Sequence, residues 1–276
     1  MNSPLIVEMV GSTAVLTLNR PQQRNALDLS LREALADAVP RLRDDRNVRA
    51  VVITGAGGHF CAGADVKLLA DAQASQRDVF EGRERVRRFR LWVDELIDLE
   101  KPVIAAIEGH AVGAGLSLAL AADIVLAAPS ARFCAVFARI GYVPDMGAMY
   151  LLPRAIGLAR AKELVFSARM VDAQEAQRIG LVQAIHPAHG LREAALALAA
   201  RFEHAPLGAL GIAKQMMNRA FETDRRMVFE YEALAQSLCR ESDFHREAVA
   251  RFTTKQAPLF DWGRGPSMPP VSGETT

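Results

Sequence analysis

The sequence has few cysteines, no long uninterrupted apolar run and almost no net charge. Its three cysteines (Cys61, Cys134 and Cys239) are an odd number, lie far apart and form no C-x-x-C pair. Neither a disulfide framework nor a zinc site is therefore expected, and this cysteine usage favours a reducing, cytoplasmic location. The 33 basic and 32 acidic side chains leave a formal charge of +1. A general nucleic-acid-binding protein needs a basic surface, so this balance argues against that class.

The most apolar stretch, Val103–Ala128, is interrupted by Glu108, His110 and Asp123. A membrane-spanning helix needs ~20 consecutive apolar residues, so no membrane span and no membrane partner are expected. The N-terminal residues lack the basic and long apolar regions of a signal peptide. What the sequence does have is 276 residues, of which 50% are apolar and 24% are charged. This balance is typical of a globular protein with a sizeable core.

Short apolar segments alternate with helical patterns through the first two thirds of the sequence. The runs Leu5–Val10 and Ala14–Leu18 predict an opening β-hairpin, and Asp28 is one of two residues placed to cap the helix that follows. Arg49–Thr54 and Pro102–Ile107 have the apolar composition of buried strands. This alternation of strands and helices predicts an α/β layered core.

Beyond Gly190 only helical patterns remain, over residues 191–204, 206–221 and 225–252. A helical C-terminal module attached to an α/β core is therefore expected. The predicted division is an α/β core over residues 1–190, a helical module over residues 191–262, and a proline-rich, disordered tail over residues 263–276.

Two glycine-containing turns each follow a predicted buried strand. They are Phe60-Cys-Ala-Gly-Ala-Asp65 and Gly109-His-Ala-Val-Gly-Ala-Gly115. Small residues let a ligand approach the backbone closely, and the N–H groups at the start of a following helix have no intrahelical acceptor. Two such turns that converge would form a backbone oxyanion hole, in which each donor is typically worth ~3 kcal/mol of barrier. The alternative is that both are tight strand-to-helix turns that bind nothing.

Several motifs in the same order resemble those of one family, the crotonase superfamily of enoyl-CoA hydratases and isomerases. The resemblance covers roughly residues 5–260. The motifs that carry it are Asn19-Arg-Pro-Gln-Gln-Arg-Asn-Ala26, Thr54-Gly-Ala-Gly-Gly-His-Phe-Cys-Ala-Gly-Ala-Asp65, Lys101-Pro-Val-Ile-Ala-Ala-Ile-Glu-Gly109, Leu152-Pro-Arg-Ala-Ile-Gly157 and Asp172-Ala-Gln-Glu-Ala-Gln-Arg-Ile-Gly-Leu-Val182.

The resemblance implies an α/β fold of the crotonase (ClpP-like) type, a spiral of ββα units with a C-terminal helical trimerisation module. It also implies a homotrimer or homohexamer, an acyl-CoA thioester as substrate, and no metal or redox cofactor, since coenzyme A is part of the substrate. The thioester oxygen is expected to accept hydrogen bonds from the N–H groups of Ala64 and Ala114. The family's usual Gly-Gly-Gly segment is here Gly113-Ala114-Gly115, which preserves the donor unless the central position needs a positive φ.

Further binding residues are carried over from the family by position alone. The adenine and pantetheine contacts match Arg24, Ala26, Ala62, Asp65 and Val66. The C-terminal contacts to coenzyme A are matched more weakly, at Phe252, Lys255 and Phe260.

The residues that would transfer a proton depart from the hydratase pattern. Hydratases of the family use two glutamates, and those positions hold Ser117 and Phe137, neither of which can act as a carboxylate base. The stretch Val136–Asp145 is similar to one in ring-opening isomerases of phenylacetate degradation, and some Δ3,Δ2-enoyl-CoA isomerases also carry a carboxylate where Asp145 stands. One carboxylate suffices for a 1,3-proton shift through an enolate. The alternative is that Asp145 only caps a helix that starts at Met146.

Other candidate groups favour structural roles. Ser117, His110 and Asp123 have the side chains of a hydrolase triad, but no G-x-S-x-G elbow accompanies them. His59 and His110 are expected to make structural hydrogen bonds near the pocket. The arginines between residues 83 and 90 alternate with glutamates, which indicates a solvated helix face. The function predicted from the sequence is an enoyl-CoA isomerase. A hydratase with a rearranged acid–base pair and a non-catalytic acyl-CoA-binding protein remain as alternatives.

Overall fold

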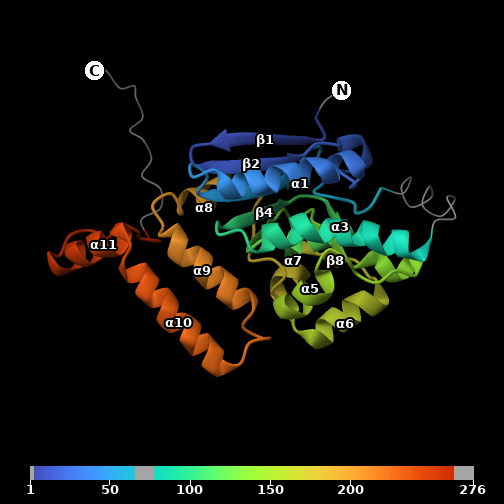
Figure 1. Cartoon of the computed structure of the whole chain (residues 1–276). Coiled ribbons are helices and arrows are strands. Elements are labelled where there is room, and N and C mark those ends of the chain that lie inside the picture. Colours follow the sequence, from blue (N-terminus) through green and yellow to red (C-terminus); the bar gives the residue numbers. More distant parts are fainter. Residues whose placement is uncertain (1–2, 66–77, 264–276) are drawn as a thin grey trace, which may run out of the picture.

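The computed structural model describes residues 3–65 and 78–263 (Figure 1). Val66 and almost all of the predicted tail therefore lie outside the described residues. A six-stranded sheet is parallel except for the opening hairpin. It consists, in spatial order, of β1 (Leu5–Val10), β2 (Thr13–Leu18), β3 (Ala50–Gly55), β4 (Val103–Ile107), β6 (Ile124–Ala127) and β9 (Ala184–Ile185).

A second, smaller sheet lies beside the first. It consists of β5 (His110–Val112), β7 (Arg132–Cys134) and β8 (Val171–Asp172), in that order. The chain repeatedly forms one strand of the large sheet, then one strand of the small sheet, then a helix, as in β4, β5 and α4 (Ala114–Leu120). The structure therefore contains the expected spiral of ββα units.

Most of the other described helices pack around these sheets. The full set of other helices is η1 (Pro21–Gln23), α1 (Leu29–Asp44), α3 (Val79–Ile97), η2 (Val136–Ile140), α5 (Ala148–Ile156), α6 (Leu158–Ser167), α7 (Ala173–Arg178), η3 (Ala188–Gly190), α8 (Leu191–Ala200), α9 (Leu207–Asn218), α10 (Arg225–Arg240) and α11 (Asp243–Thr253). Among the described residues, no helix is long and apolar enough to cross a membrane.

The central strands of the large sheet are buried on both faces. Successive side chains of a strand point to opposite sides, so each strand contributes to two cores. One set of side chains joins the core shared with α1, α3, α4 and α5, namely Leu16, Ile53 and Ala105. The alternate set packs against α8, namely Val15, Val52 and Ile104. The helical module expected from residue 191 thus contributes its first helix to the core.

The predicted opening hairpin is confirmed, with Leu5 paired to Leu18. Asp28 caps α1 as expected, because its Oδ1 accepts from the N–H of Leu31 at 2.8 Å. The prediction of one continuous helix over residues 225–252 is wrong. The chain forms two helices there, and the Ser242 hydroxyl caps the second by accepting from the N–H of His245 at 3.1 Å.

The arginine-rich segment lies on α3. Arg83 and Arg87 are exposed there, and Arg87 pairs with Glu84 at 3.0 Å, which agrees with a solvated face. The side chains of the other three arginines lie outside the described part of the chain.

Candidate active site

The loop that carries Ala64 is fixed by one buried and one half-buried polar side chain, both of which follow β2. Asn25 is fully buried, and its amide donates to the main-chain oxygens of Ala56 and His59 at 2.9 and 2.6 Å. Arg20 pairs with both Asp28 and Asp65 at 3.1 Å, and so joins the start of α1 to the end of the loop. The sequence analysis missed Arg20 and Asn25, although both lie inside the Asn19–Ala26 motif.

The N–H of Ala64 points away from its neighbouring strand. Leu27 and Ala64 form an isolated parallel bridge, in which Leu27 bonds to Gly63 and Asp65 at 2.7 and 3.3 Å. The oxygen of Gly63 and the N–H of Asp65 therefore make the hydrogen bonds of this bridge, and the N–H of Ala64 takes no part in it.

Ala114 is the first residue of α4, so its N–H has no intrahelical acceptor. The left-handed conformation that this turn requires is taken by Gly113, whose φ is 56°, and Ala114 is not among the residues with positive φ. Alanine in place of the family's central glycine therefore leaves the donor in place.

The two turns touch each other directly. A Cβ atom built on Gly63 would lie 2.7 Å from the oxygen of Val112 and 3.6 Å from the nitrogen of Ala114. A Cβ built on Gly115 would lie 2.2 Å from the oxygen of Cys61. Glycine at both positions is thus what allows the Ala64 and Ala114 loops to approach. An oxyanion hole requires two N–H donors that lie close together.

Asp145 lies in the loop between η2 and α5, and α5 packs against α4. Its Oδ1 is buried, and none of the described residues donates a hydrogen bond to it. Burial raises the pKa of the Asp145 carboxyl above its ordinary value, while the charge of Arg32 on α1 acts in the opposite direction. A carboxylate held in this way is available to a ligand and tends to take up a proton.

The alternative, that Asp145 only caps a helix starting at Met146, is wrong. The helix starts at Ala148, its N-cap is Gly147, and no side chain caps it. Met146 instead adopts a left-handed conformation, with φ 49°, which costs a non-glycine residue about 1 kcal/mol or more. Backbone strain of this kind concentrates at functional sites, here directly beside Asp145.

The two positions that hold glutamates in hydratases are filled by core side chains. Ser117 is fully buried and its hydroxyl donates to the oxygen of Gly113 at 3.3 Å, while Phe137 is buried as well. The hydrolase triad considered from the sequence does not form, because His110 contacts His59 and Asp123 pairs with Lys214. Burial also raises the pKa of the Cys61 thiol to about 12, so this cysteine is no nucleophile.

The residues expected to contact coenzyme A fall into two groups. Near the loops, the oxygen of Arg24 accepts from the N–H of Ala62 at 2.9 Å, Ala26 is buried, and Asp65 is held by Arg20. The C-terminal residues lie elsewhere in this chain, since α11 is at the outer end of the arm formed by α9 and α10, well away from α5 (Figure 1). Phe252 is 86% exposed on α11, Lys255 is exposed just beyond it, and Phe260 packs against the core near α8.

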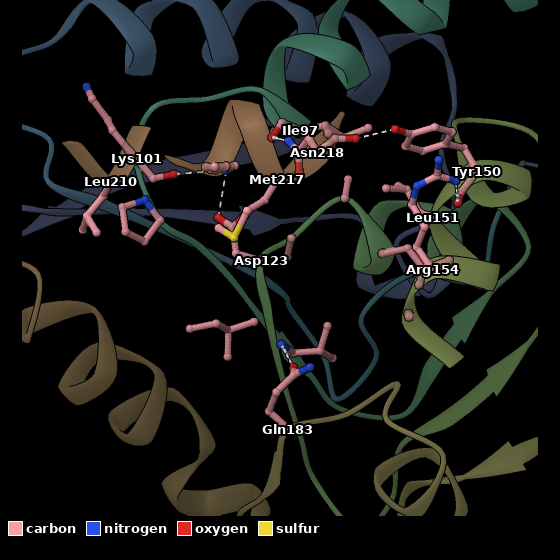
Figure 2. A pocket seen from close by; sticks show the side chains of 18 of the residues that line it. Ile97, Lys101, Asp123, Tyr150, Leu151, Arg154, Gln183, Leu210, Met217 and Asn218 are labelled. Carbon is pink, nitrogen blue, oxygen red and sulfur yellow. Dashed lines mark hydrogen bonds and ion pairs between the residues drawn. The ribbon is translucent and has the colours of Figure 1, made fainter. Parts of the chain in front are cut away.

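A separate cavity of about 590 Å³ lies between α9 and the elements α4, β6 and α5. Figure 2 shows Lys101, Asp123, Tyr150, Arg154 and Gln183 around it. Neither Ala64, Ala114 nor Asp145 lines this cavity. It is therefore distinct from the candidate active site.

The chain is similar over nearly its whole length to proteins of one family. A model of the enoyl-CoA hydratase/isomerase family matches residues 8–263. A probable enoyl-CoA hydratase from Mycobacterium tuberculosis is 35% identical over 256 residues, which cover 93% of this chain and 97% of that protein. The 1,2-epoxyphenylacetyl-CoA isomerase of Escherichia coli is 35% identical over 246 residues, or 89% of this chain and 93% of that protein.

Solved structures give the same result. An enoyl-CoA hydratase/isomerase from Cupriavidus metallidurans superposes with a TM-score of 0.88 and 38% identity, covering 93% of this chain and 96% of that chain. The sequence motifs, the two adjacent glycine turns and these similarities agree. The chain therefore belongs to the enoyl-CoA hydratase/isomerase family, the crotonase superfamily, and its spiral of ββα units is the crotonase fold.

Proposed function

We propose that the chain is an enoyl-CoA isomerase that moves a double bond by proton transfer. The Asp145 carboxylate removes a proton from C2 of a 3-enoyl-CoA, and the electrons of that C–H bond move toward the thioester carbonyl. The dienolate carries its negative charge on the carbonyl oxygen, to which the N–H groups of Ala64 and Ala114 donate. The Asp145 carboxylic acid then returns the proton to C4, which gives the 2-enoyl-CoA without water or a redox partner.

The observation that carries this proposal is the buried Oδ1 of Asp145, which has no donor among the described residues. A carboxylate used only for structure would be expected to have its hydrogen bonds made. Because Ser117 and Phe137 cannot act as bases, Asp145 is the carboxylate best placed to do so. Its raised pKa suits a group that must alternately accept and release a proton.

We further propose that coenzyme A enters as part of the substrate, beside Arg24, Ala26, Ala62 and Asp65, with no metal or redox cofactor. These four residues lie on two segments that are joined by the hydrogen bond between Ala62 and Arg24 and by the pairing of Asp65 with Arg20. Small side chains at residues 26 and 62 leave the main chain accessible to an adenine or a pantetheine arm.

Assembly into a homotrimer or homohexamer is part of the proposal. The exposed apolar side chains of α10 and α11, which include Phe229, Leu234, Leu238 and Phe252, would be covered by neighbouring subunits. Phe252 and Lys255 would then reach coenzyme A bound to another subunit. The three thiols fit a reducing compartment, which we take to be the cytoplasm. Light scattering on the purified chain measures the assembly, and a monomeric mass would contradict it.

Hydration of a 2-enoyl-CoA is the second candidate, because several relatives are named hydratases. One experiment separates the two candidates. Wild type and Asp145→Asn are incubated in D₂O with a 3-enoyl-CoA and, separately, with a 2-enoyl-CoA. We expect isomerisation with deuterium exchange at C2 and C4, reduced about a hundredfold or more in the variant, as for a general acid–base group. Hydration that is unaffected by the substitution would refute the proposal, and acyl-CoA binding without any turnover would indicate a non-catalytic protein.

A further inference from the structure

We propose that His59 and His110 form a positioning pair that holds the Ala64 and Ala114 loops in the register that the oxyanion hole needs. The inference rests on the proposed function, because the pair acts through these two N–H donors. Neither histidine touches the reacting atoms. The pair would act by fixing the backbone that carries the donors.

The two imidazoles are in direct contact. Their Nδ1 atoms are 3.1 Å apart, and the ring centroids are 4.9 Å apart. The main-chain N–H of His110 also points at Nδ1 of His59, at 3.4 Å. Since a main-chain N–H can only donate, Nδ1 of His59 must be the unprotonated acceptor, and His110 donates from its own Nδ1. This assignment leaves the proton of His59 on Nε2.

The pair lies at one end of the short ladder that joins the two loops. The N–H of Phe60 donates to Glu108 at 2.7 Å, that of Cys61 donates to His110 at 2.7 Å, and that of Val112 donates to Cys61 at 3.0 Å. His59 immediately precedes this ladder on one loop, and His110 is part of it on the other. Beyond the ladder, the two loops continue to the two proposed oxyanion donors.

The close approach of the two loops at this end depends on the absence of a side chain. A Cβ built on Gly109 would lie 2.3 Å from Nδ1 of His59 and 2.3 Å from the oxygen of Gly58. The main-chain oxygen of His59 is in turn held by the buried amide of Asn25 at 2.6 Å. The main chain of His59 is therefore held within its own loop, and the contact between the two rings links it to the second loop.

The surroundings of His110 favour its uncharged form. Burial lowers the pKa of His110 first of all, and His59, Arg24 and Arg132 lower it further. Arg132 lies opposite His110 in the register of β5 and β7, and Glu108 is near the same turn.

Two substitutions at one position test the proposal. His59→Ala removes the acceptor, whereas the Oδ1 of His59→Asn can occupy the place of Nδ1 and accept in its stead. A bound 2,4-dienoyl-CoA reports on the oxyanion hole alone, since its absorption moves to longer wavelength when the thioester carbonyl is polarised. This probe needs no proton transfer by Asp145. A protein that polarises the probe but does not isomerise 3-enoyl-CoA would refute the proposed function without refuting the oxyanion hole.

We expect wild type to shift the absorption at pH 7.5. His59→Ala should lose most of the shift and about tenfold or more in kcat at pH 7.5, within the range for a disturbed oxyanion donor. His59→Asn should recover most of both losses. The exposed His189→Asn is the matched control and should behave as wild type.

A merely structural role gives a different result. Thermal unfolding shows whether His59→Ala is folded. Its affinity for free coenzyme A, which has no thioester carbonyl, shows whether the coenzyme A site is intact. A folded His59→Ala that keeps the wild-type shift overturns the proposal. So does a folded His59→Asn that loses as much of the shift as His59→Ala, because its Oδ1 can accept the same hydrogen bonds.

Discussion

Lys214 of α9 places its ammonium 2.8 Å from the carboxylate of Asp123, next to β6, and so joins the C-terminal helices to the large sheet. Asp123 also accepts from the N–H of Val103 at 2.7 Å. Burial raises the pKa of Asp123, and the Lys214 charge opposes that effect. The two side chains are mostly removed from solvent, so each depends on the other for compensation of its charge.

Lys214→Met is therefore expected to lower the free energy of unfolding by about 3 kcal/mol, because the charge of Asp123 stays buried without its cation. Urea unfolding at pH 7 measures the loss. The double variant Asp123→Asn with Lys214→Met removes both charges and should recover much of it. Equal losses in the single and the double variant would show that the two residues are not coupled.

Asp145→Asn should reduce isomerisation about a hundredfold or more. At the same time it should stabilise the protein by roughly 1 kcal/mol at pH 7, as often happens when a functional charge is removed. The folded-state pKa of Asp145 lies above its ordinary value of 3.8, so the folded state binds this proton more tightly than the unfolded state. Ionisation as the pH rises through the folded-state pKa therefore costs stability.

The stability difference between Asp145→Asn and wild type should consequently shrink as the pH is lowered toward 4. Denaturant unfolding at several pH values measures it. A wild type that is more stable than the variant at pH 7 would mean that the Asp145 carboxylate makes favourable contacts in the fold.

Local patterns in the sequence were enough to predict the long strands and the glycine turns. The hairpin of β1 and β2 follows from its own apolar alternation, and Asp28 caps α1 through a contact only three residues away. The strands β8 and β9 contain two residues each and exist because other strands lie beside them. No periodicity can reveal a strand of that length.

The interactions within the candidate site are the least predictable from the sequence. Pro144 and Asp145 have the appearance of a helix start, but the turn continues through the left-handed Met146 before α5 begins. His59 and His110 were expected to make structural hydrogen bonds, yet nothing in the sequence indicates that residues 51 positions apart bond to each other. Such pairs depend on how the sheets are stacked, which is a tertiary property.

Arg32 is another residue that sequence reasoning missed, and it should set the pH range in which Asp145 works. Its charge lowers the pKa of Asp145 against the effect of burial. Replacing it by methionine removes that opposition, so the pKa of Asp145 should rise further. The acid side of the pH profile of kcat should move to higher pH, because Asp145 must be ionised to remove a proton.

Arg41 provides the control for this measurement. It lies on the same helix, its side chain is 76% exposed, and it pairs with Asp37. Arg41→Met should leave the kcat profile unchanged. An identical profile for Arg32→Met and wild type would mean that the Arg32 charge does not reach the titrating group.

Gly63→Ala tests the close approach of the two oxyanion turns. The new Cβ would lie 2.7 Å from the oxygen of Val112, and φ at this position is 99°, which alanine adopts only with strain. The loop must shift, and displacement of one oxyanion donor typically costs about a hundredfold in kcat.

Gly208→Ala is the matched control. Gly208 lies within α9, nothing is within 4 Å of a Cβ added there, and a helical alanine stabilises by up to about 1 kcal/mol. We expect Gly63→Ala to lose kcat far beyond any loss of affinity for free coenzyme A, whereas Gly208→Ala keeps both. Full activity in Gly63→Ala would mean that the Ala64 N–H is not required where this geometry places it.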